Sequence, residues 1–133
     1  MKVHGGCHCG NLRYEAEIDP ATIGVCHCTD CQRLTGAAFS VYAPVRREHL
    51  RLSGEPRIYV KTAESGNRRA QAFCPVCATR IYASAAENPQ VFNLRVGTID
   101  ERAILAPKMQ IWCRSALPWV NALDAVPGVD KEP

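Results

Sequence analysis

Short runs of alternating hydrophobic and polar residues dominate the chain. From Leu12 to Ile18 every second residue is apolar, and the residues between them are charged. Because successive side chains of a strand point to opposite faces, this pattern predicts a half-buried β-strand. Similar runs predict further strands at 37–45, 50–53, 56–62, 69–74, 79–85 and 91–99.

Gly, Pro, Asn and Asp separate these runs, as at 53–56, 64–67 and 87–89. Strands divided by such turn residues are typical of antiparallel sheets, so we predict a mainly β fold. One short helix is expected near 29–36, with Thr29 or Asp30 as its N-cap and Gly36 at its end. A short turn is also expected at 47–50.

The chain has 133 residues, which fits one domain. We predict a single domain over 1–125 and a mobile tail over 126–133. The first residues have no apolar segment typical of a secretory signal, and no run reaches the roughly 18 apolar residues of a membrane helix. We therefore expect a cytoplasmic protein. The net charge of +3 comes from scattered residues, which predicts neither a nucleic-acid nor a membrane partner.

Eight cysteines change this picture, since the cytoplasm keeps thiols reduced and many thiols there indicate metal or redox chemistry. A C-x-C pair on a strand puts both sulfurs on one face, and C-x-x-C does so from a tight turn. Two such pairs can enclose one zinc ion in four thiolates, which is typical of a structural site. The pairs that suit this site are Cys7, Cys9, Cys74 and Cys77.

The second group, Cys26, Cys28 and Cys31, offers three thiolates. Three protein ligands leave one tetrahedral position for water or substrate, which is typical of a catalytic zinc. Thiolate ligands donate charge and weaken zinc as a Lewis acid, whereas a thiol that binds the ion is deprotonated. The spacing therefore predicts a second zinc that activates a thiol for attack on a small electrophile.

Other uses of the cysteines stay open. Disulfides could pair them, although cysteines two residues apart rarely close without strain. Cys113 could join the group of three and make both ions structural, or it could be a buried inert thiol. It could also serve redox chemistry like that of sulfoxide reductases. A zinc-stabilised binding module without catalysis is the alternative to an enzyme.

Five segments, in order from Gly5 to Val120, resemble the glutathione-dependent formaldehyde-activating (GFA) family: GGCHCGNLRYEAE, CHCTDCQRLTGAAF, LRLSGEPRIY, FCPVCATRIY and RSALPWV. The resemblance implies an Mss4-like fold, an open β architecture built around a structural zinc. It also implies a carbon–sulfur lyase activity that joins glutathione to formaldehyde. The implied zinc ligands are Cys7, Cys9, Cys74 and Cys77 for the structural ion and Cys26, Cys28 and Cys31 for the catalytic ion.

Two residues depart from the family pattern. Ala78 stands in the turn after CPVC where members usually carry Gly, and Gln110 stands where members often carry His. A left-handed turn at Ala78 would cost roughly 1 kcal/mol relative to Gly. If the His shapes the family's pocket, Gln110 points to a different substrate.

The expected partners are a small-molecule thiol and an aldehyde. Glutathione is anionic, so basic residues should contact it, and Arg33 is the first candidate because it follows the three-cysteine group. Arg68, Arg69 and Arg80 are further candidates. We expect Trp112 and Trp119 to lie in the core.

Overall fold

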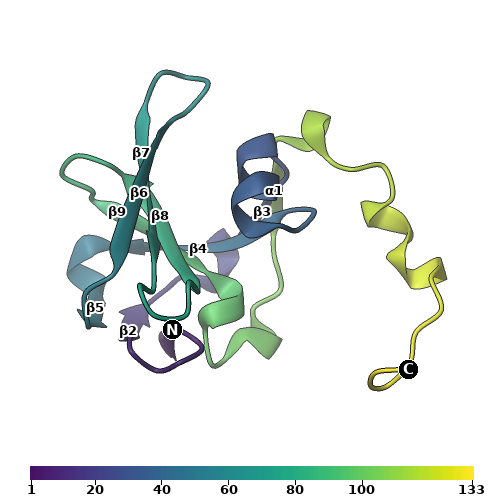
Figure 1. Cartoon of the computed structure of the whole chain (residues 1–133), viewed down its shortest axis with the longest axis horizontal. Helices are drawn as coiled ribbons and strands as arrows, with labels where there is room; N and C mark the ends of the chain where they lie inside the picture. Colours follow the sequence, from purple (N-terminus) through teal and green to yellow (C-terminus); the bar gives the residue numbers. More distant parts are fainter.

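The computed structural model describes all 133 residues and is mainly β, with two open sheets (Figure 1). The smaller sheet has the order β1-β2-β5, and both of its strand pairs are antiparallel. Its strands are β1 (Lys2–Gly6), β2 (Arg13–Glu17) and β5 (Leu50–Ser53). The prediction of a mainly β, open architecture is confirmed.

The larger sheet has seven strands in the order β10-β3-β4-β9-β8-β7-β6. Neighbours pair antiparallel throughout, except that β10 runs parallel to β3. Its strands are β3 (Gly24–Cys26), β4 (Ser40–Arg46), β6 (Arg57–Thr62), β7 (Arg68–Phe73), β8 (Arg80–Ala85), β9 (Val91–Arg95) and β10 (Met109–Ile111).

Strand alternation gives the larger sheet two different faces. Ala43 and Leu94, which pair across β4 and β9, are buried and pack in one core cluster with Tyr14 and Ala16 of the smaller sheet. Residues between these positions, such as Tyr42 and Arg95, must point to the other face. One face of the larger sheet therefore closes the core against the smaller sheet, and the opposite face is free to form a site.

Six of the seven predicted strands overlap observed strands closely, and the seventh, 91–99, is only partly right. It ends at Arg95 and continues as a 3-10 turn, η3 (Val96–Thr98). The sequence did not predict β1, β3 or β10, because each is short and rich in Gly or Cys or lacks alternation. Gly5 of β1 lies against Tyr14, and a Cβ there would stand 2.3 Å from the Tyr14 hydroxyl.

The predicted helix is present as α1 (Thr29–Thr35), and Gly36 ends it with a left-handed φ of 64°. The predicted N-cap was wrong: it is Cys28, one residue earlier, whose sulfur accepts the Cys31 N–H at 3.2 Å. No helix has the length and apolar character needed to cross a bilayer. The 3-10 turns besides η3 are η1 (Pro20–Thr22), η2 (Arg47–His49), η4 (Arg102–Ile104), η5 (Cys113–Ser115) and η6 (Val120–Ala125).

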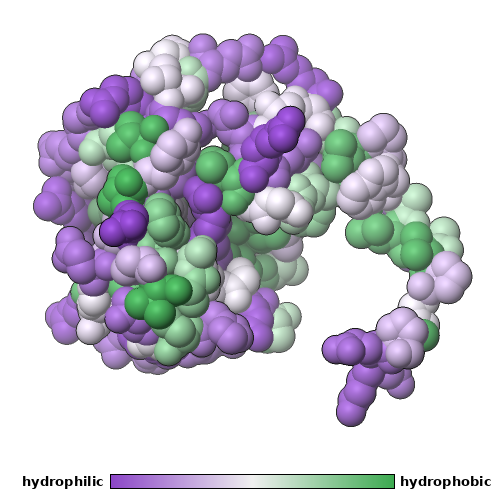
Figure 2. All heavy atoms as spheres, viewed as in Figure 1, coloured by the Kyte–Doolittle hydropathy of each residue, from purple (hydrophilic) through white to green (hydrophobic).

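The C-terminal segment projects from the body of the protein (Figure 1), and hydrophobic side chains lie along it (Figure 2). Trp119, just before η6, is 53% exposed, and Leu123 and Val126 are also exposed. The prediction that Trp119 lies in the core was wrong, because the segment that carries it does not fold back onto the two sheets.

Candidate functional site

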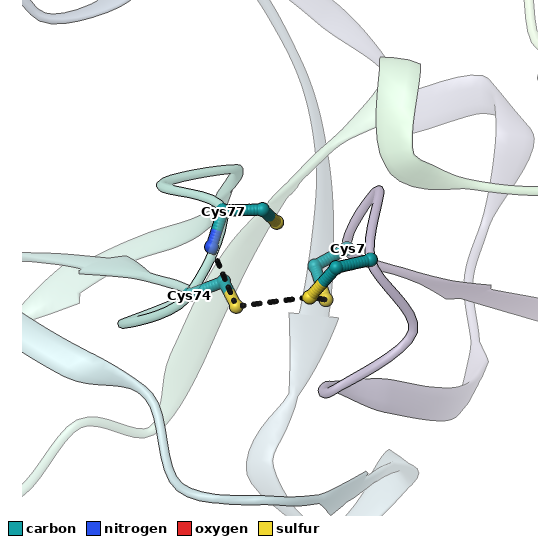
Figure 3. A group of neighbouring side chains, drawn as sticks. Cys7, Cys74 and Cys77 are labelled. Atoms are coloured by element: carbon teal, nitrogen blue, oxygen red, sulfur yellow. Dashed lines mark hydrogen bonds between the residues drawn. The ribbon is translucent and has the colours of Figure 1, made fainter.

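The first cysteine cluster joins two distant turns. Cys7 and Cys9 follow β1, and Cys74 and Cys77 lie in the loop between β7 and β8. The side chains of Cys7 and Cys74 face each other across the gap between the two turns (Figure 3). All four sulfurs lie within 4.8 Å of one another. The Cys7–Cys9 and Cys9–Cys74 separations are 3.6 and 3.7 Å. These values match the roughly 3.8 Å sulfur spacing of a tetrahedral zinc–thiolate site.

Hydrogen-bond donors surround several sulfurs of this cluster. The Leu12 N–H donates to Cys7 Sγ at 3.1 Å, and the Cys77 N–H donates to Cys74 Sγ at 3.5 Å. The Thr79 hydroxyl lies 3.1 Å from Cys77 Sγ, and this contact is the main cause that lowers the Cys77 pKa to about 5. Donors arranged in this way stabilise the charged form that binds metal.

The turn that carries Cys74 and Cys77 ends in a left-handed backbone conformation at Ala78, as the sequence predicted. Ala78 has a φ of 64°, and its N–H donates to the Cys74 carbonyl at 2.9 Å. This bond closes the C-x-x-C turn and sets both sulfurs toward the metal position. Ala78 therefore occupies a left-handed position that glycine would adopt more easily.

The second cluster forms where β3 meets α1. Cys26 ends β3, Cys28 caps α1, Cys31 lies in the first turn of α1, and the three sulfurs are within 4.8 Å of one another. The Ser40 hydroxyl donates to Cys31 Sγ at 3.2 Å. Hydrogen bonds from Cys26, and then from Ser40, lower the Cys31 pKa to about 5, while the bond with Cys31 raises the Cys26 pKa.

The donor sets of both clusters suit zinc. Each offers only thiolate sulfur at tetrahedral spacing, which is the ligand chemistry of zinc rather than of magnesium or calcium. The first cluster has four sulfurs and the second has three. Cys113 is exposed and belongs to neither cluster, so the structure does not support its joining the group of three.

A pocket of about 590 Å³ opens beside the three-cysteine cluster, with Cys26 and Cys31 in its wall. Its floor is the outer face of the larger sheet, where Gln71 of β7 and Arg95 of β9 lie on strands on either side of β8. Trp112 lines another side and is 42% exposed. The prediction that Trp112 lies in the core was therefore wrong: its side chain faces the pocket instead.

The family model described as "Glutathione-dependent formaldehyde-activating enzyme" matches residues 2–115. The chain belongs to this family. A crystal structure of a Rhodobacter sphaeroides protein superposes with a TM-score of 0.61 at 20% identity, covering 80% of this chain and 98% of that one. At this identity the likeness concerns the fold alone.

Both cysteine groups that the GFA resemblance implied as ligand sets are thus brought together in space. The roles given to them, structural for the first and catalytic for the second, stay predictions. Arg33 is exposed on α1 and is not among the residues that line the pocket. Its contact with glutathione also stays a prediction.

Gln110, the departure from the GFA pattern, supports the loop of the second cluster. Its Oε1 lies 2.7 Å from Nε2 of His27, a residue that is only 1% exposed. Since an amide oxygen only accepts, Nε2 is the donor in this contact. Gln32 completes this support by donating to the carbonyls of His27 and Ser115 at 2.9 and 3.0 Å.

The sequence did not single out Gln71 or Arg95. Alternation within β7 and β9 places each on one face, but the strand order that sets them over one floor depends on pairing between distant segments. Arg69, named as a weaker candidate, does line the pocket.

Proposed function

We propose that this protein is a zinc-dependent enzyme of the carbon–sulfur lyase type that joins a thiol, glutathione or a similar one, to formaldehyde or another small aldehyde. The observation that carries the proposal is the pocket beside Cys26 and Cys31, because a three-thiolate cluster that faces open space can receive a fourth sulfur. Family membership supports the same reaction class.

Zinc held by Cys26, Cys28 and Cys31 would supply the positive charge that favours an incoming thiol as its thiolate. The thiol sulfur then forms a bond to the carbonyl carbon, and the π-electron pair of the carbonyl moves to its oxygen. That oxygen takes a proton equivalent to the one the thiol lost, so no oxidant or reductant is needed. The reverse reaction breaks the carbon–sulfur bond, which is lyase chemistry.

The chain's own groups would bind and orient the two reactants. Tyr42 and Asn93 present polar groups on the pocket floor, where they can donate hydrogen bonds to the carbonyl oxygen. Trp112 and Ile111 line one side of the pocket with apolar surface. Ser40 donates a hydrogen bond to Cys31 Sγ at 3.2 Å, which favours the charged form of that sulfur.

The test follows adduct exchange by NMR in a mixture of zinc-loaded protein, glutathione and formaldehyde. The wild-type protein should exchange free and adduct forms faster than the spontaneous reaction, and Cys28→Ser should abolish this acceleration. Cys113→Ser is the matched control, because Cys113 is exposed and outside both clusters. Its rate should equal that of the wild type.

A wild-type rate equal to the spontaneous one would remove the proposed activity and favour the alternative, a zinc-stabilised binding module. A Cys28→Ser protein that still accelerates exchange would place the chemistry elsewhere.

A further inference from the structure

Three arginines gather around one buried amide on the pocket side of the larger sheet. Gln71 is 4% exposed, and its Oε1 accepts from Arg95 at 3.2 Å and from Arg80 at 3.4 Å. Arg69 lies two residues from Gln71 on the same face of β7 and also lines the pocket. Arg95 and Arg69 therefore bring positive charge to the pocket lining, and Arg80, which is not among the lining residues, adds to this charge through its contact with Gln71.

None of these arginines has an acidic partner. The structure contains nine ion pairs, and Arg69, Arg80 and Arg95 take part in none of them. The other charged side chains at the pocket are paired. Nζ of Lys61 lies 2.5 Å from Oδ2 of Asp30. Glu64 likewise pairs with Arg114 at 3.2 Å. The excess of positive charge thus belongs to the floor and not to the rim.

Burial makes this excess costly. The Nε of Arg95 is buried and has no acceptor. Burial is also the main cause that lowers the pKa of both Arg95 and Arg80. Guanidinium groups remain charged in proteins, so a buried one without an anion carries an uncompensated desolvation cost. An anion in the pocket would relieve that cost.

The three-thiolate cluster balances only part of this charge. Zinc with three thiolates carries 2 − 3 = −1, and a fourth thiolate brings this to −2. Against +3 from the three arginines, of which Arg69 and Arg95 line the pocket and Arg80 contacts Gln71, one positive charge remains. One carboxylate would neutralise it.

The strand register places Arg95 within reach of a small substrate at the cysteines. Cys26 pairs with Ser40, and two residues further along β4 Tyr42 pairs with Arg95. Two strand spacings of about 4.8 Å and two residue rises of about 3.4 Å put the Cα atoms of Cys26 and Arg95 about 12 Å apart. The arginine side chain and a few substrate bonds span this distance.

We infer that Arg95, Arg69 and Gln71 form a carboxylate-binding subsite, so that one of the two substrates carries a carboxylate a few bonds from its reacting atom. The inference rests on the proposed function and names its substrate class. Arg95 and Arg69 donate charge-assisted hydrogen bonds to the carboxylate, and Gln71 fixes the Arg95 guanidinium. The carboxylate belongs either to the thiol or to the aldehyde, as in a 2-oxo acid.

Two binding experiments on the zinc-loaded protein separate these sources. In the thiol arm, calorimetry compares N-acetylcysteine with N-acetylcysteine amide, which differ only in the carboxylate. In the aldehyde arm, ligand line broadening in NMR spectra compares glyoxylate with acetaldehyde. In one arm the carboxylate ligand should bind roughly 10- to 100-fold more tightly, the effect of a charge-assisted hydrogen bond.

Arg95→Gln should reduce this preference to about 3-fold or less while zinc content stays at the wild-type value. Arg51→Gln, an exposed arginine on the smaller sheet, is the matched control and should keep the full preference. If Arg95→Gln does not fold, Arg69→Gln, which removes the other arginine of the pocket lining, should also lower the carboxylate preference.

No preference in either arm, or a preference that survives both pocket variants, would overturn the subsite. A carboxylate preference without catalysed exchange would overturn the proposed reaction and leave the subsite standing. Catalysed exchange without a carboxylate preference would support the proposed reaction and overturn the subsite. The two failures are therefore distinguishable.

Discussion

Replacing one cysteine in each cluster by serine should have very different effects on stability. Cys74 is fully buried, lies 3.7 Å from Cys9 Sγ and accepts the N–H of Cys77. It connects the loop between β7 and β8 to the turn after β1, two parts of the chain in different sheets. Cys28 is half-buried and caps one short helix.

The expected magnitudes follow from these positions. A closed four-thiolate zinc site contributes about 10–16 kcal/mol to folding in small zinc domains. This equals or exceeds the whole stability of about 5–15 kcal/mol of an ordinary domain. Cys74→Ser, which removes one ligand of this site, should therefore leave the chain largely unfolded.

Cys28→Ser removes a ligand of the open cluster but keeps the helix cap, because serine is among the preferred N-cap residues. The Cys28 sulfur accepts only the backbone N–H of Cys31, at 3.2 Å, and a serine oxygen can replace that contact. We expect a loss below about 2 kcal/mol, which for a domain of this size lowers Tm by less than about 10 °C.

Thermal melts followed by circular dichroism, with elemental analysis of zinc on the same samples, test both variants. Cys28→Ser should retain one zinc per chain and a cooperative transition, and Cys74→Ser should show no cooperative transition. A Cys74→Ser protein that melts within a few degrees of the wild type, or an unfolded Cys28→Ser protein, would refute the division of roles.

Three further substitutions test smaller parts of the structure. Ala78→Gly should raise the free energy of unfolding by up to about 1 kcal/mol in urea melts, because relief of the left-handed conformation exceeds the entropy cost of glycine; a loss would contradict this. Gln110→Leu should lower it by about 1–3 kcal/mol, since His27 then has two buried nitrogens without partners; an unchanged value would remove the supporting role. Hydrogen bonds from the ring and backbone of His4 lower the Glu101 pKa, so its carboxylate stabilises the fold above the ordinary pKa of about 4.3 and loses this effect as pH falls through the lowered value. Glu101→Gln should therefore cost less than about 1 kcal/mol at pH 7 and nothing in strong acid, and a deficit that grows as pH falls would contradict this.

Local sequence patterns predicted the parts of the fold that local forces determine. Alternation from Leu12 to Ile18 predicts β2 because one face of that strand is buried against the core. Spacing predicts both cysteine clusters because C-x-C and C-x-x-C can each deliver two sulfurs without knowledge of the rest of the chain. Gly36 predicts the end of α1 because only a left-handed residue closes that turn.

The remaining features depend on contacts between distant segments. The three-residue strands β3 and β10 exist because each pairs with a neighbour, and their own residues show no alternation. The large apolar ring of Trp112 is typical of a core residue, but Trp112 directly follows β10 and lines the pocket. The grouping of Arg95 with Gln71 depends on β8 lying between β7 and β9, and this order follows from the whole sheet.

The central claim is that one zinc site is closed and the other accepts an incoming thiol. Cadmium-113 NMR of protein in which cadmium replaces zinc reports each site separately. The account predicts two resonances, of which the one lost in Cys28→Ser shifts when N-acetylcysteine is added, while the other stays fixed. Two resonances that both remain unmoved at saturating thiol would contradict the claim.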